Sequence, residues 1–294
     1  TVTTGNQNIG IGLAAMNGST TTGDKNIAIG VSAGNALTSG KENVFMGTDA
    51  GGAVTTTTRL VYIGHEAGAA NTNGIGNTAV GWKALKQYDL ENTNTAIGAE
   101  AMSGAGASNS CVAIGNETLA GSTTTGANGT VGIGYQALKA LTSGGGNIAV
   151  GFEAGLLVTD NTDNVMIGHQ AFNASDSGDS ENVVIGSNAG GAINHGSSDG
   201  NVLIGLSAGL GGAAALADCV VIGKNAMKST AGNAQSGTVA IGKEAFNALT
   251  TGTKNIAIGY QAGLEATIED FNTYIGYQAA YRTAGLNNQY NTMV

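Results

Sequence analysis

Residues 255–263 read NIAIGYQAG, and residues 26–34 (NIAIGVSAG) and 94–102 (NTAIGAEAM) are close copies of this segment. Alignment on the glycine of the motif gives sixteen copies over residues 5–282, at spacings of 17–19 residues. Ile, Val or Met precedes the glycine in all copies, and Ala stands three residues after it in fifteen. Such a regular period indicates a repeat protein, although the length alone would suggest two globular domains.

The unit has the composition of a short strand followed by turns. Its apolar segment holds only a few residues, is rich in Val and Ile and alternates with period two, which is typical of a strand. The links are rich in Gly, Ser, Thr and Asn, and a 17-residue unit is too short for a helical hairpin. We therefore predict an all-β fold, a parallel β-solenoid of about sixteen coils of 17–19 residues. Coils stacked ~4.8 Å apart would give a rod on the order of 75 Å long.

The predicted solenoid forms one domain over residues 1–282, and residues 283–294 are a C-terminal tail or the start of the next segment. Positions in a copy are numbered below from its glycine, which is position 0. Loops of variable length link the copies (70–76, 104–110, 172–181, 191–200, 211–217 and 229–237), and binding specificity is expected there.

Positions −3 and −1 are aliphatic and point to one face of the strand, while position −2 points to the other and is also apolar. We predict that the −1 column lines the core: Ile11, Ile29, Ile63, Ile97, Ile114, Ile133, Ile167, Ile185, Ile204, Ile222, Ile241, Ile258 and Ile275. A strand that is apolar on both faces is covered on both. The −2 column is therefore predicted to form a subunit interface of an obligate homo-oligomer, through Phe45, Tyr62, Met166, Val184, Leu203, Val221 and Tyr274.

The repeat glycine is expected at a turn with positive φ or at a close approach of two backbones. These glycines are Gly12, Gly30, Gly47, Gly64, Gly81, Gly98, Gly115, Gly134, Gly151, Gly168, Gly186, Gly205, Gly223, Gly242, Gly259 and Gly276. Position −4 is Asn in eleven copies and is predicted to form stacked amide ladders. Cys111 and Cys219 take this position in two other copies, where we interpret them as small, semi-buried residues.

Composition and charge exclude several classes of protein. The chain has 50 glycines among 294 residues but no proline, which excludes collagen. The net charge of −9 argues against nucleic acids and anionic membrane surfaces as partners. No run of about 18 apolar residues occurs, so membrane insertion is not expected. Two cysteines and three histidines do not form a metal or disulfide pattern, and we expect no cofactor and no metal.

Two sets of carboxylates were weighed as catalytic groups. Asp49 with Glu66, and Glu100 with Glu117, stand at position +2 of neighbouring coils, near 5 Å apart. This separation suits a retaining glycosidase or a Ca²⁺ site. A solvated acidic stripe is the interpretation that we favour, because no aromatic sugar platform surrounds either pair.

Position +1 carries aromatic or imidazole rings in seven copies. It is aromatic in five copies (Trp82, Tyr135, Phe152, Tyr260 and Tyr277) and His in two (His65 and His169). These aromatic side chains could bind a sugar, but we favour packing between coils or subunits. The histidines are interpreted as surface or packed imidazoles, and the alternative is a three-fold ring of imidazoles in a trimer.

The quoted motifs resemble the head repeats of trimeric autotransporter adhesins and similar repeats in bacteriophage tail fibres. The resemblance covers all sixteen copies and implies a left-handed parallel β-roll that trimerises through the strand with the Ala-Ile-Gly motif. The longer unit with Gly-Tyr-Gln-Ala, at 134–137, 259–262 and 276–279, is closer to the phage repeats. The resemblance to these families implies a homotrimer.

We therefore expect a structural, non-enzymatic protein: a rigid trimeric segment of a phage tail fibre or spike in the virion. It would attach to a host surface glycan or receptor. The alternatives are a trimeric adhesin head on a bacterial cell surface and, of another class, a polysaccharide-degrading tailspike.

Overall fold

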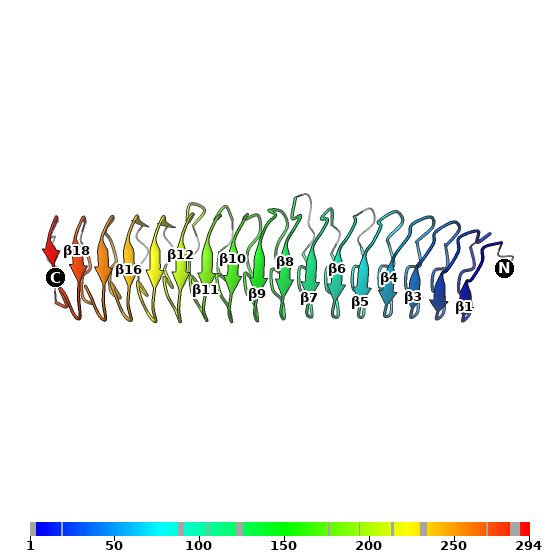
Figure 1. Cartoon of the computed structure of the whole chain (residues 1–294), viewed down its shortest axis with the longest axis horizontal. Helices are drawn as coiled ribbons and strands as arrows, with labels where there is room; N and C mark the ends of the chain where they lie inside the picture. Colours follow the sequence, from blue (N-terminus) through cyan, green and yellow to red (C-terminus); the bar gives the residue numbers. More distant parts are fainter. Residues whose placement is uncertain are drawn as a thin grey trace. The chain divides into compact units, whose positions relative to one another are not determined.

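The computed structural model describes residues 4–18, 20–87, 91–104, 106–121, 126–175, 177–193, 195–212, 215–229, 234–268, 270–282 and 289–294. The chain divides into two compact units, Thr1–Gly146 and Asn147–Val294. Each unit consists of stacked coils with one short strand per coil, and the described residues contain no helix (Figure 1). The predicted all-β parallel β-solenoid is confirmed.

The strands of the main sheet have three residues each in both units, except β19, which has two. Unit 1 contains β1 (Ile9–Ile11), β2 (Ile27–Ile29), β3 (Val44–Met46), β4 (Val61–Ile63), β5 (Thr78–Val80), β6 (Thr95–Ile97), β7 (Val112–Ile114) and β8 (Val131–Ile133). Unit 2 contains β9 (Ile148–Val150), β10 (Val165–Ile167), β11 (Val183–Ile185), β12 (Val202–Ile204), β14 (Val220–Ile222), β16 (Val239–Ile241), β17 (Ile256–Ile258), β18 (Thr273–Ile275) and β19 (Thr292–Met293). Equivalent positions pair in parallel, as in Ala28 opposite Phe45. A second, two-stranded sheet joins β13 (Leu216–Ala217) to β15 (Gln235–Ser236) in the loops.

The described end of the chain continues the repeat. In β19, Thr292 pairs with Thr273 of β18, and Asn291 takes the place of the −4 asparagine. Residues 283–288 of the predicted tail lie outside the described residues. A single domain over 1–282 stays a prediction.

The two faces of the strands are the reverse of our prediction. The seven residues predicted at a subunit interface, Phe45, Tyr62, Met166, Val184, Leu203, Val221 and Tyr274, are fully buried inside the single chain. None of the thirteen predicted core isoleucines is buried: Ile11, Ile97, Ile114, Ile133, Ile167, Ile258 and Ile275 are exposed, and Ile29, Ile63, Ile185, Ile204, Ile222 and Ile241 are half-buried. Position −2 therefore fills the coil, and positions −3 and −1 point outward.

The interior column varies in size because position +4 compensates for it in most coils. Glycine stands at +4 in the coils of Phe45, Tyr62, Val184 and Leu203, and a Cβ at Gly51 would lie 2.6 Å from Phe45 Cδ1. In six coils −2 is small and +4 is large, as in Ala79 with Leu85 and Ala240 with Phe246. Ala28 and Gly34 are both small, and a Cβ at Gly34 would lie 2.7 Å from Phe45 Cδ2 of the next coil. Large side chains therefore fill the narrow interior both within a coil and across neighbouring coils.

The repeat glycine meets both predicted conditions. Its φ lies between +129° and +145° in all sixteen copies, a region that L side chains rarely adopt. The backbone of the next coil also lies very close, since a Cβ at Gly30 would be 2.6 Å from the Gly47 carbonyl oxygen. The predicted role of these glycines is confirmed, because any other residue would be strained and would push neighbouring coils apart.

The predicted asparagine ladder is confirmed and is buried. Asn26 Oδ1 accepts the backbone N–H of Asn43 at 3.1 Å, and Asn26 Nδ2 donates to the Gly40 carbonyl at 2.9 Å. Cys111 fits the same column: its N–H donates to Asn94 Oδ1 at 2.9 Å. These amides satisfy backbone groups that would otherwise be buried without partners.

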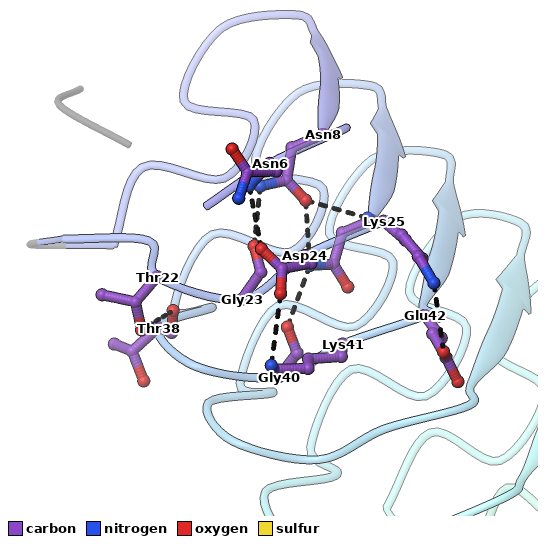
Figure 2. A network of polar contacts seen from close by, with 11 residues as sticks. Asn6, Asn8, Thr22, Gly23, Asp24, Lys25, Thr38, Gly40, Lys41 and Glu42 are labelled. Carbon is purple, nitrogen blue, oxygen red and sulfur yellow. Dashed lines mark hydrogen bonds and ion pairs between the residues drawn. The ribbon is translucent and has the colours of Figure 1, made fainter. Parts of the chain in front are cut away.

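A second ladder, at position −6, was not predicted. Here the side chain of the later coil accepts the backbone N–H of the earlier coil, as from Asn92 to Asn109 Oδ1 and from Asn109 to Asn128 Oδ1, both at 2.7 Å. Figure 2 shows its first member, where the Asn6 N–H donates to Asp24 Oδ1 at 2.9 Å and Lys41 Nζ lies 3.2 Å from Asp24 Oδ2. The Asn6 hydrogen bond and then Lys41 lower the pKa of Asp24.

Candidate interaction surface

The outward face of the strands is a mainly aliphatic surface in each unit, with Thr78 and Thr95 in unit 1 and Thr273 in unit 2. It is formed by positions −3 and −1, and the exposed fraction is 58 % at Ile11, 38 % at Ile148 and 37 % at Ile167 and Ile258. Three residues per strand with strands ~4.8 Å apart give roughly 50 Å² per coil, or roughly 400 Å² in each unit. Apolar patches of this size on a single chain commonly mark an interaction site.

The face is bordered at position +1 by exposed side chains. Trp82 is 47 % exposed, and the Lys83 ammonium lies 4.1 Å from its ring centroid. Phe152 stacks on His169 and Tyr260 stacks on Tyr277, each with ring centroids 5.3 Å apart. Packing between coils, the role that we favoured for these rings, is therefore observed for both pairs. Sugar binding stays an alternative prediction.

Two of the four +2 carboxylates that were weighed as catalytic groups, Glu66 and Glu117, are paired with cations or amides. Glu66 Oε2 lies 2.5 Å from Lys86 Nζ, and Glu117 Oε2 lies 2.5 Å from Lys139 Nζ and 2.6 Å from Gln136 Nε2. The bonds from Lys86 and Lys139 are the main causes that lower the pKa values of Glu66 and Glu117. A glycosidase acid needs a raised pKa, so these two groups have the opposite electrostatic environment.

Cys111 and Cys219 are fully buried inside the coils, whereas we predicted a semi-buried position. Burial raises the pKa of both thiols, to about 11 for Cys219. The Cys111 Sγ–H donates to the Ala127 carbonyl at 3.1 Å. A protonated, hydrogen-bonded thiol of this kind is a poor nucleophile.

The part of the chain that the structure describes holds no group of three or more His, Cys, Asp and Glu side chains placed to bind a metal ion. The described ranges of the chain also form no pocket. Among the same residues, no helix has the length and apolar character needed to cross a bilayer.

The fold defines the chain as a parallel β-solenoid with an exposed aliphatic sheet face. Comparison of its sequence with protein-family models and with curated proteins found no match.

Proposed function

We propose that the chain is a structural and adhesive segment of a homotrimeric fibre, most simply a phage tail fibre or spike that attaches to a host surface. The observation that supports this proposal is the outward aliphatic face, which remains exposed although the interior of each coil is already filled. A surface of this length and regularity gains stability when another apolar surface covers it. The repeat motif, which resembles those of trimeric fibres and adhesins, supports three copies.

The adhesive role would belong to the loops rather than to the sheet face. The loops that contain β13 and β15 are tied together in parallel, with Leu216 opposite Gln235. Both side chains are almost fully buried, so this part of the loops is fixed on the coil. Three copies of a weak loop site would bind a surface through avidity.

A bacterial surface adhesin head is the second candidate, because the same motif resembles both classes.

Light scattering should give a mass of about 86 kDa, three times the chain mass of 28.8 kDa. Labelled protein should then bind intact bacterial cells, and a monomeric variant should bind them at least tenfold more weakly. A monomeric wild-type protein, or equal binding by the monomeric variant, would overturn the proposal. Oligosaccharides released from capsular polysaccharide would show a tailspike enzyme instead.

A further inference from the structure

The outward face has two borders, which lie at opposite ends of each strand. The −5 border precedes the strand, and the +1 border follows the repeat glycine. Residues of both borders are exposed, for example Ser110 and Asn116 around β7. Six residues of nearly extended chain separate them, so in one chain they are on the order of 15 Å apart.

The two borders nevertheless compensate for each other in size. Five coils have glycine at −5, and each of these has a bulky residue at +1: Gly76 with Trp82, Gly129 with Tyr135, Gly146 with Phe152, Gly200 with Leu206, and Gly237 with Lys243. The exposed fractions of Tyr135 and Leu206 are both 42 %. The remaining coils combine polar, aliphatic and aromatic side chains without such a size pattern.

The chain's own packing does not require these glycines. At −5, φ is +68° for Gly129 and +70° for Gly76, but Lys25 and Glu42 adopt +60° at the same position of other coils. A Cβ at Gly129 would meet nothing within 4 Å, and one at Gly76 would meet only a methyl group of Thr93 at 3.7 Å. Space for a side chain is therefore present at Gly76 and Gly129, where the positive φ favours glycine but does not require it.

Charge follows the same pairing in one coil. Asp218 at −5 shares a coil with Lys224 at +1. No copy carries an acidic residue at +1, whereas four carry one at −5. Opposite charges on opposite borders would attract if the two borders met.

We propose that the −5 border of one copy packs against the +1 border of the next copy at the same coil, in a parallel, in-register, cyclic trimer. Around a three-fold axis along the coil stack, each face meets two neighbours, so unlike borders come together. A parallel two-fold dimer about the same axis would also bring unlike borders together but would stop at two chains, whereas an antiparallel dimer would place like borders together. Only another copy of this chain carries the complementary column at the same spacing. The inference rests on the proposed homotrimer and specifies which residues meet in it.

Disulfide trapping tests this pairing. The double variant Ser110→Cys/Asn116→Cys places one thiol on each border of the same coil. Under mild oxidation it should give a covalent trimer of about 86 kDa, three chains of 28.8 kDa, on a non-reducing gel. Each single variant should stay at the mass of one chain, as should Ser110→Cys/Thr48→Cys, whose thiols are four coils or roughly 19 Å out of register. Wild-type protein controls for Cys111 and Cys219, which are buried.

Each result has one meaning. Dimers formed by a single variant, or equal trapping of the out-of-register pair, would overturn the cyclic in-register pairing. A trimeric wild-type mass without trapping in the double variant would overturn the pairing and leave the trimer standing. A monomeric wild-type mass would overturn the trimer itself.

Discussion

The reversed strand faces can be tested with one substitution made at two neighbouring residues of β10. Met166 points into the coil and is fully buried, and Ile167 points outward with an exposed fraction of 37 %. Met166→Lys changes the volume little but places an ammonium group where no water reaches it. The cost of an unpaired buried charge is several kcal/mol, against a total stability of about 5–15 kcal/mol for a typical domain.

Ile167→Lys carries the same charge on the opposite face. The ammonium group reaches solvent, so we expect a loss of about 1 kcal/mol or less in the single chain. In the trimer, three such groups would enter an apolar interface, so assembly should be lost.

Circular dichroism with urea unfolding and light scattering would distinguish the two variants. Met166→Lys should lose the cooperative unfolding transition and most β signal. Ile167→Lys should keep the β signal at low temperature and scatter as a single chain of 28.8 kDa. An assembled, folded Met166→Lys together with an unfolded Ile167→Lys would refute this assignment of the faces.

Three further outcomes are expected. Phe45→Ala should lower the free energy of unfolding in urea by about 3–5 kcal/mol. Adding Gly51→Leu should recover part of this loss, because it copies the small–large arrangement of other coils. A further loss of stability in the double variant would contradict size compensation. The lowered pKa of Glu117 gives stability that is present above about pH 4.5 and is lost as pH falls through the folded pKa, so Glu117→Gln should flatten the acid limb of a pH–stability curve. Asp179 is fully buried and accepts hydrogen bonds from Ser175 Oγ at 2.9 Å and Ser198 N at 2.8 Å. Asp179→Ala should therefore lower the free energy of unfolding by about 2–3 kcal/mol, measured by thermal unfolding, and Asp179→Asn should lower it clearly less. Equal losses in the two variants would argue against a hydrogen-bonding role of Asp179.

The sequence was sufficient to predict the coiled fold, because the residues that indicate it recur at the same position in every copy. A glycine at the same place in sixteen copies indicates a backbone constraint, and both the positive φ and the close backbone approach are present. Asparagine in one column predicted an amide ladder because an amide both donates and accepts along a stack. The ladder at −6 was missed because Asn, Asp and Ser share that column with residues that cannot accept, such as Lys41 and Ile75.

Assignment of the strand faces failed because both are apolar, so hydrophobicity alone could not orient them. The uniformly aliphatic −1 column was typical of a core, but in this fold the uniform column lies on the outward face. Phe45 fits inside the coil because glycine stands beside it at Gly51 and Gly34, and the size of the interior side chain therefore varies from coil to coil. The opposite sizes of −2 and +4 in most coils were present in the sequence and would have identified the interior. The −4 asparagines lie on the same face of the strand as position −2, and their repetition also indicated that this face is the interior.

The mass of the wild-type protein in solution is the most direct test of assembly through the outward face. Multi-angle light scattering at micromolar concentration should give about 86 kDa, which is three chains of 28.8 kDa. A mass of one chain, unchanged as the concentration rises, would contradict assembly through this face.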